Sequence, residues 1–259
     1  MPVAELRDSA ERLRAAWALN TALKWDRSPR GAELRQIAEV GPRRELRDRQ
    51  GMSVLIASIL PRDGSAIDVG SHAGAVLREI VRVAPAGRHI AYEPLPMFAA
   101  NLAAEFPTVE VRNAALSDAT GQVEFIHVES APEFSGMRER EYGAYANSPL
   151  STITVRAERL DDALPSDFVP KLIKIDVEGA ELLVLRGARE TLRRHRPIVV
   201  FEHGIGAADR YGYGPGDVYD LLAGELDMRI FDLDGAGPYS RERFVEVFPE
   251  PLWNFLAVP

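Results

Sequence analysis

The sequence predicts an α/β protein built on a mostly parallel seven-stranded sheet with helices on both faces. From Gly64 onward, short apolar runs of strand length alternate with segments of helical spacing. That pattern is typical of repeated strand–helix–strand units. The chain has 259 residues, of which 46% are hydrophobic and 27% charged. This composition is ordinary for a globular protein with one large core.

The first fifty residues differ from the rest. They contain two helix-like runs, Val3–Leu23 and Ala32–Arg49, which Ser28-Pro-Arg-Gly31 separates. We interpret residues 1–50 as an N-terminal helical extension that caps the main domain, residues 51–259. A lid over a substrate pocket, or a contact in a homodimer, is the alternative role for this extension.

In the main domain, the expected strands and helices follow one another along the chain. Five strands are expected at Ser65–Gly70, Arg88–Glu93, Val109–Asn113, Lys171–Asp176 and Pro197–Glu202. Helices are expected at Ala73–Val83, Met97–Phe106 and Gly179–Arg194. Two further strands, Asp227–Asp232 and Trp253–Val258, are expected to form a hairpin that closes the sheet.

The alternation is interrupted between Gly121 and Arg159. Two strands are expected there, Val123–Val128 and Thr152–Val155, and between them lies Glu129–Ser151, rich in Ser, Glu, Gly, Pro and Tyr. Long irregular connections of this kind are usually functional or disordered. A substrate-facing loop and a disordered segment both remain open.

Composition also excludes several classes of protein. Without cysteine the chain has no disulfides or thiolate metal sites. No stretch reaches the roughly 18 to 20 apolar residues of a membrane span, and no secretory signal is found, so a cytoplasmic location is expected. A net charge of -8 disfavours a broad nucleic-acid surface.

The turn Asp68-Val-Gly-Ser-His-Ala-Gly74 joins the first strand to the first helix. Gly70 lets ligand atoms approach the backbone, and the N–H groups of the helix start favour an anionic group. The spacing matches neither the Gly-x-Gly-x-x-Gly dinucleotide motif nor a P-loop. With Asp68 placed to face an ammonium group, the turn suits an amino-acid zwitterion such as the methionine part of S-adenosylmethionine.

The second strand ends in Tyr92-Glu93-Pro94. An acid at this position can accept two hydrogen bonds from a ribose diol. Glu93 follows Asp68 by 25 residues, close to the roughly 20 expected between a glycine turn and its ribose acid. Glu93 is therefore predicted to bind a ribose.

Several segments together resemble the FkbM-like methyltransferase family. They are the first two motifs, Asn113-Ala-Ala-Leu-Ser-Asp118, Val155–Leu164, Leu172-Ile-Lys-Ile-Asp-Val-Glu-Gly-Ala-Glu181, Pro197–His203 and Asn254–Pro259. The resemblance implies a Rossmann-like fold and methyl transfer from S-adenosylmethionine, usually to oxygen. It also implies a hydroxylated small molecule or glycan as acceptor, such as a sugar, a glycolipid or a polyketide-type natural product.

The resemblance also implies residue roles. Asp68, Gly70 and Gly74 would form the methionine end of the cofactor site, together with Ser71 and His72, and Glu93 would hold the ribose. Asn113 and Ala114 would border the adenine, and Asp176 would lie beside the methyl group. The family commonly has Asn where this chain has His72, which puts that side-chain contact in question.

Acid–base candidates follow the fourth and fifth strands. We predict Asp176, Glu178 and His203 as catalytic, because one positioned base must take the proton of the acceptor. Glu178 and Glu181 would share a helix face, where stabilising the helix dipole is an alternative role. His203 is equally well explained as a loop histidine bound to the backbone.

Other functions were weighed against methyl transfer. A divalent metal held by Asp176, Glu202 and His203 is an alternative that the spacing does not favour, so no metal is predicted. A dehydrogenase is a rival function that the missing Gly-x-Gly-x-x-Gly pattern disfavours. A non-catalytic protein that retains the fold is the third alternative.

Overall fold

The structure is a computed structural model that describes residues 42–140, 142–249 and 252–259. The helical runs expected at Val3–Leu23 and in the first part of Ala32–Arg49 lie outside these residues. Helix α3 (Pro42–Ile59) is the first described element, and it runs through residue 50. The division into an extension and a main domain at that residue stays a prediction.

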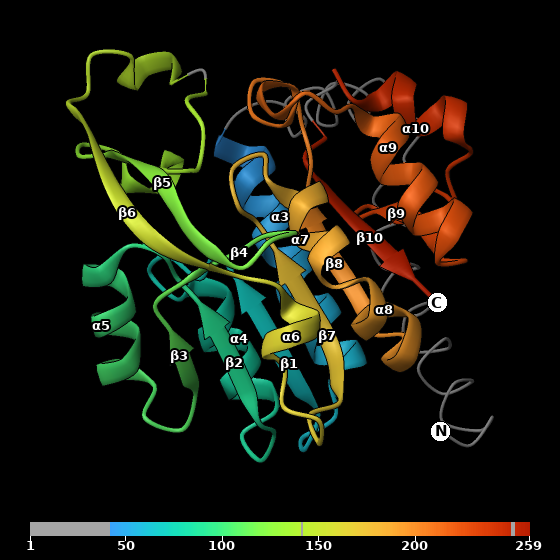
Figure 1. The fold of residues 1–259 in the computed structure, drawn as a ribbon. Helices are drawn as coiled ribbons and strands as arrows, with labels where there is room; N and C mark the ends of the chain where they lie inside the picture. Colours follow the sequence, from blue (N-terminus) through green and yellow to red (C-terminus); the bar gives the residue numbers. More distant parts are fainter. Residues whose placement is uncertain (1–41, 141, 250–251) are drawn as a thin grey trace.

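A seven-stranded sheet forms the centre of the described molecule (Figure 1). Its strands are β1 (Ser65–Val69), β2 (His89–Tyr92), β3 (Glu110–Arg112), β7 (Pro170–Ile175), β8 (Ile198–Glu202), β9 (Arg229–Asp232) and β10 (Asn254–Val258). They lie in the order β3-β2-β1-β7-β8-β10-β9. The first five pair in parallel, whereas β10 is antiparallel to both of its neighbours. The predicted mostly parallel α/β sheet is confirmed.

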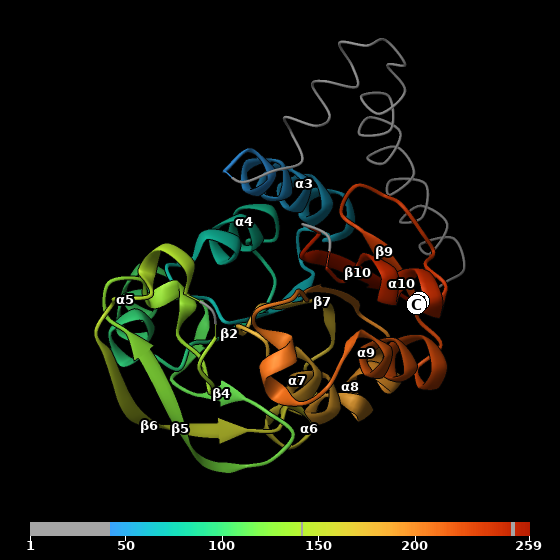
Figure 2. The same ribbon diagram turned by 90° about the horizontal axis from the view of Figure 1, so that it is seen from above.

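Helices cover both faces of this sheet. Figure 2 shows α3 and α4 (Ala75–Val83) on one side and α7 (Glu181–Gly187) and α8 (Arg189–His195) on the other. Successive strand side chains point to opposite faces. Accordingly, Ala66 of β1 packs in the core under α3 and α4, while Ile67 and Val69 pack in the core under α7 and α8.

The same alternation positions the charged residues at the strand ends. Leu172 packs with Ala66, so Lys174 points to the α3–α4 face, as Asp68 does. Asp68 and Lys174 are also direct partners in the β1–β7 register. On β8, Val200 lies in the core under α3 and α4, so Glu202 follows it to that face.

A second, three-stranded sheet accounts for the interrupted region. It consists of β4 (Ala115–Leu116), β6 (Leu150–Glu158) and β5 (Gly121–Val128), in that order. The two strands predicted here are present and longer than expected, and they pair with each other antiparallel. Gly136 pairs with Ile126 of β5, which folds the following loop back against the sheet.

The structure corrects three element predictions. The helix expected at Gly179–Arg194 is two helices, because Ala188 leaves the helical conformation between α7 and α8. The first helix begins at Ala75, after the left-handed Gly74. The closing hairpin is interrupted by α10 (Arg241–Val247), and β10 enters the sheet between β8 and β9.

The described residues also form short helices that were not predicted. They are α6 (Leu160–Ala163), α9 (Pro215–Tyr219), the π-helical turn Asp220–Glu225, α10, and the 3-10 turns Pro132–Phe134, Gly143–Tyr145 and Ala208–Tyr211. Helix α5 (Pro96–Glu105) agrees with the expected Met97–Phe106. In the part of the chain that the structure describes, no helix combines the length and apolarity needed to cross a bilayer.

Candidate active site

Two glycines shape the turn after β1. Gly70 has φ of 74°, and a Cβ on it would lie 1.8 Å from the carbonyl oxygen of Asp176. No other residue fits there without moving the backbone that follows β7. Gly74 has φ of 75° at the start of α4, and a Cβ there would meet the Leu102 side chain at 2.7 Å. The turn thus depends on glycine at both predicted positions.

Glu93 holds this turn beside the end of β2. Its Oε2 accepts a hydrogen bond from the His72 backbone N–H at 2.7 Å, and its Oε1 accepts one from the Leu95 N–H at 2.9 Å. Burial raises the pKa of Glu93, against the effect of these two backbone donors. Each carboxylate oxygen can accept a second bond, so Glu93 keeps acceptor capacity for a ligand.

A cavity opens at the carboxyl ends of β1, β2 and β7. Its volume is about 750 Å³, which includes space open to solvent. Six predicted site residues line it: Gly70, His72, Glu93, Ala114, Asp176 and Glu178. Apolar lining comes from Leu95, Leu116, Phe125 and Met137.

Two other predicted cofactor residues, Ser71 and Asn113, donate hydrogen bonds to backbone carbonyls near the cavity. Ser71 is buried and donates from Oγ to the carbonyl of Asp68 at 3.0 Å. Asn113 donates from Nδ2 to the carbonyls of Glu93 and Pro94, each at 2.9 Å. Among the described residues, these side chains fix the backbone of the site and do not line the cavity.

His72 lies on the cavity wall with its ring 4.3 Å from that of Phe98, centroid to centroid. Its backbone has φ of 44°, a left-handed conformation that Gly70 and Gly74 flank. Within the described part of the chain, its buried Nε2 has no hydrogen-bond partner. Burial lowers the pKa of His72. The neutral ring therefore offers one free polar atom to a ligand.

Lys174 connects the glycine turn to the acids. Its Nζ donates to the carbonyl of Gly70 at 2.7 Å and lies 3.4 Å from Asp68 Oδ1 and 3.5 Å from Asp176 Oδ2. Burial lowers the pKa of Lys174, but the two carboxylates outweigh it and raise the pKa overall. Asp68 is fully buried beside this ammonium group, where burial raises its pKa.

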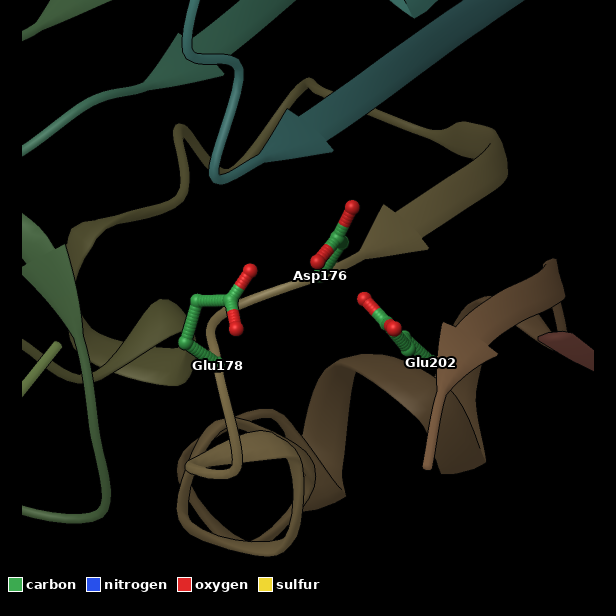
Figure 3. Close-up of side chains that lie close together, drawn as sticks. All are labelled: Asp176, Glu178 and Glu202. Atoms are coloured by element: carbon green, nitrogen blue, oxygen red, sulfur yellow. The ribbon is translucent and has the colours of Figure 1, made fainter. Parts of the chain in front are cut away.

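Three carboxyl groups converge beyond Lys174 (Figure 3). One oxygen each of Asp176, Glu178 and Glu202 lies within 4.8 Å of the other two. Arg140 forms an ion pair with Glu178, and Lys174 faces Asp176. These three oxygens are close enough together to hold a metal ion, and Lys174 and Arg140 are the cations that face them. His203, the third residue of the metal alternative, is not part of the group.

The pKa values of Asp176 and Glu202 shift in opposite directions. The side chain of Asp176 is 38% exposed, and Lys174 outweighs burial to lower its pKa. Burial and the charge of Asp176 raise the pKa of Glu202 well above its ordinary value. The two carboxyl groups share a hydrogen bond. If the pair shares one proton, these directions place that proton on Glu202 and the negative charge on Asp176.

Glu178 and Glu181 do not share a helix face, contrary to expectation. Helix α7 begins only at Glu181, and Glu178 lies before it with φ of 56°. The buried Glu181 accepts hydrogen bonds from the N–H groups of Val177 and Gly179 at 3.2 and 3.0 Å. Burial raises its pKa to about 7. Glu181 thus holds the turn that presents Glu178.

His203 lies in an aromatic cluster on the other face of β8. Its ring centroid is 4.9 Å from Phe248, 6.0 Å from Phe244 and 6.4 Å from Tyr213. Burial lowers its pKa to about 4. Its backbone N–H donates to the carbonyl of Trp253 at 2.7 Å. Both ring nitrogens are buried without a hydrogen-bond partner among the described residues, so the ring is not bound to the backbone as the alternative expected. The ring also lies outside the cavity lining, where it cannot act as the predicted base on a bound ligand.

Residues between β5 and β6 complete the cavity, and the sequence did not single them out. Glu133 and Ser135 line it, and Arg140 pairs with Glu178. The guanidinium of Arg140 also stacks 5.0 Å from the Phe134 ring centroid. Composition indicated a substrate-facing loop as one of two interpretations. The pairing of Ile126 with Gly136 folds the loop back on β5, and Pro132, Glu133, Ser135 and Met137 are its residues that line the cavity.

Comparison with known proteins gives one family match. The family model of the methyltransferase FkbM domain matches residues 68–227. The AMB antimetabolite synthetase AmbE of Pseudomonas aeruginosa is 32% identical over 182 residues. That match covers 56% of this chain and 9% of AmbE, so the chain spans only a small part of this relative.

Two solved structures resemble the chain more distantly. The methyltransferase FkbM from Methylobacillus flagellatus is 14% identical, with 83% of this chain and 59% of that chain covered and a TM-score of 0.47. An S-adenosylmethionine-dependent O-methyltransferase from Thermotoga maritima is 10% identical, with coverages of 85% and 65% and a TM-score of 0.43. Because residues 68–227 are more than half of the chain, it belongs to the FkbM family of S-adenosylmethionine-dependent methyltransferases.

Proposed function

We propose that this protein transfers the methyl group of S-adenosylmethionine to a hydroxyl oxygen of a sugar, glycolipid or natural-product acceptor. The observation that carries the proposal is one cavity bounded by the bare backbone of Gly70, the carboxylate of Glu93 and the carboxylate of Asp176. These are the group types needed for an amino-acid end, a ribose and a reacting centre.

The lining of the cavity fits such a cofactor. Glu93 has acceptor capacity for a ribose diol, and Ala114 and Leu116 offer an apolar surface to an adenine. The free Nε2 of His72 provides a further hydrogen-bonding atom. Asp68 acts in this proposal through Lys174, whose contact with the Gly70 carbonyl keeps the turn in place.

When bound, S-adenosylmethionine supplies an electrophilic methyl carbon on a sulfonium. The residues of the chain orient the acceptor and take its proton. Asp176 is the base in this proposal, because it is ionised and its side chain is accessible from the cavity. A positioned base contributes typically about 10² to 10⁴ in rate, and orientation contributes the larger part.

The proposed class of methyl acceptor is inferred from the polar residues of the cavity lining that are not assigned to the cofactor. Glu133 and Ser135, in the segment that follows β5, line the cavity together with Glu178. Glu178 lies in the turn after β7 and pairs with Arg140 of that segment. Hydroxyl groups of a sugar or polyol can donate to the carboxylates and accept from the guanidinium. The specificity of the enzyme is assigned to this segment.

Calorimetry with S-adenosylmethionine tests the cofactor, using Glu93→Ala and Asp68→Ala as variants. We expect Glu93→Ala to weaken binding by roughly 10- to 100-fold, because hydrogen bonds to charged groups are worth about 1.5 to 3 kcal/mol. A smaller loss is expected for Asp68→Ala. The control Glu105→Ala removes a half-exposed carboxylate that pairs with Arg78 on the surface, and should bind like the wild type.

Transfer of a labelled methyl group to a panel of sugars and polyhydroxylated natural products tests the reaction. A single class of hydroxylated acceptor should accumulate label. Absence of cofactor binding at millimolar concentration contradicts the proposal. Cofactor binding without transfer to any hydroxylated acceptor would instead support the non-catalytic alternative.

A further inference from the structure

The two carboxyl groups of Asp176 and Glu202 meet at the ends of neighbouring strands. Ile175 and Phe201 are partners in the β7–β8 register, so the next residues of both strands lie side by side. One carboxyl oxygen of each side chain lies within 4.8 Å of one of the other, and the two groups face each other in Figure 3. Two carboxylates in contact cannot both ionise without strong repulsion, so such a pair retains one proton.

The surrounding charges put that proton on Glu202. Lys174 lies 3.5 Å from Asp176 and 3.4 Å from Asp68, and Arg140 pairs with Glu178. Within the described residues Glu202 has no ion pair of its own.

Two other titratable groups face the pair. Glu181 raises the pKa of Glu202, and the ring of His72 lies near Asp176. Asp68 also faces Lys174, so the carboxylates of Asp68, Asp176 and Glu178 already outnumber the two cations when Glu202 is protonated. A fourth negative charge on Glu202 would have no cation of its own.

We propose that Asp176 and Glu202 share one proton in the free enzyme and that a positively charged methyl donor expels it on binding. The inference rests on the proposed function, because S-adenosylmethionine carries a net positive charge and S-adenosylhomocysteine does not. A cation entering the cavity beside Asp176 favours the fully ionised pair. The carboxyl O–H bond of Glu202 breaks, and its proton goes to solvent.

The expelled proton prepares the pair for the reaction. With both members ionised, one carboxylate accepts the proton of the acceptor hydroxyl as that oxygen forms its bond to the methyl carbon. The carbon–sulfur bond breaks, and its electron pair stays on sulfur, which leaves a neutral thioether. The pair then again holds one proton beside an uncharged product. In the free enzyme the ionised Asp176 is occupied by the shared proton of Glu202, and it is free to accept the proton of the acceptor hydroxyl only while the donor is present.

Calorimetry in two buffers of different ionisation enthalpy measures this proton directly, with EDTA present so that no metal ion contributes. The full chain is titrated at about pH 6.5, well above the ordinary pKa of a glutamate side chain. We expect release of about one proton per bound S-adenosylmethionine. Binding of S-adenosylhomocysteine should release almost none.

Variants assign the proton to the pair. Glu202→Gln should still bind S-adenosylmethionine but release almost no proton. Asp176→Asn should release less than the wild type, because the negative partner that adds to burial in keeping Glu202 protonated is removed. Asp176→Asn is the second variant in case Glu202→Gln does not fold. Glu246→Gln, an exposed residue of α10, is the matched control and should release as much as the wild type.

The outcomes separate the inference from the proposed function. Equal heats in both buffers, with S-adenosylmethionine bound, overturn the inference alone. Release that persists in Glu202→Gln but disappears in Glu181→Gln assigns the proton to Glu181 and also overturns it. Failure of S-adenosylmethionine to bind the wild type overturns the proposed function and the inference with it.

Discussion

Glu202 and His203 are adjacent in the chain and meet opposite environments. Glu202 points to the face of the sheet where Lys174, Arg140 and Asp176 gather, and it shares a hydrogen bond with Asp176. His203 points to the other face, among Phe244, Phe248 and Tyr213. One peptide bond separates a group surrounded by charges from a group surrounded by aromatic rings.

The difference shows why proximity in sequence is a poor guide to a shared site at a strand end. Side chains alternate between faces with a period of two, so neighbours at the end of a strand belong to different sides of the sheet. Asp176 and Glu202 are far apart in sequence but meet because their strands are paired in register. The following predictions test whether the two sides are independent.

Truncating a side chain in the aromatic cluster around His203 should cost more stability than any change among the charged residues. Phe244 is 1% exposed, with its ring 5.0 Å from that of Phe255 and 6.0 Å from that of His203. Phe244→Ala should reduce the free energy of unfolding by about 3 to 5 kcal/mol, because it leaves a cavity in the core. Urea denaturation measures this, with Phe244→Leu as the milder control. The folded variant should keep wild-type affinity for the cofactor; a loss as large as that of Glu93→Ala would show that the two sides are coupled.

On the face of the sheet that carries Asp68, Lys174 and Asp176, removing the buried cation Lys174 should reduce the free energy of unfolding. Lys174→Met leaves Asp68 and Asp176 without the ammonium group that faces both, and should cost about 3 kcal/mol in urea denaturation. Adding Asp68→Asn to Lys174→Met should recover part of this loss, because the stranded carboxylate is removed. A Lys174→Met variant as stable as the wild type would mean that the ion contacts do not stabilise this face.

His203 should make the protein less stable in acid. Burial lowers its pKa from 6.5 to about 4, so between these pH values the unfolded chain binds a proton that the folded protein does not. The free energy of unfolding therefore falls as pH decreases through this range. In His203→Phe, the loss of stability between about pH 7 and 4.5 should be smaller than in the wild type by about 2 to 3 kcal/mol. Identical pH profiles would place the ring in contact with water.

Glu202 should make the free energy of unfolding fall as pH rises, which is opposite in sign to the effect of His203 and smaller. Its pKa is raised in the fold, so above the ordinary pKa of glutamate the folded protein binds a proton that the unfolded chain does not. Its contribution to stability is thus lost as pH rises. Glu202→Gln, which needs no proton, should be more stable than the wild type at neutral pH by about 1 kcal/mol. Thermal unfolding should show the two converging near pH 4.5; a variant that is less stable at neutral pH would contradict a protonated Glu202.

Features of the fold that depend on the local pattern of residue types could be predicted from the sequence. Alternating apolar runs predicted the strands and their parallel order, since a helix lies between most of them. The glycines at 70 and 74 predicted a turn that a side chain would block, and the structure has both in left-handed conformations. Glu93 and Asp176 were found because an acid at a parallel strand end faces the ligand edge of the sheet.

The rest depends on contacts between distant residues. The insertion of β10 between β8 and β9 is a choice among pairings that hydrophobic pattern alone does not distinguish. The ion pair of Arg140 with Glu178 depends on how a loop folds back on β5. The burial of His203 depends on the rings of α10, which lies well beyond it in the chain.

The position of β10 also bears on the order in which the protein folds. Arg229–Asp232 leaves the ribosome before Asn254–Val258, yet β9 joins the sheet only through β10. Until the later segment emerges, β8 presents an open edge and β9 has no partner in the sheet. A nascent chain stalled before Asn254 would therefore carry an unpaired apolar edge, which is a surface that chaperones recognise and that other chains can extend.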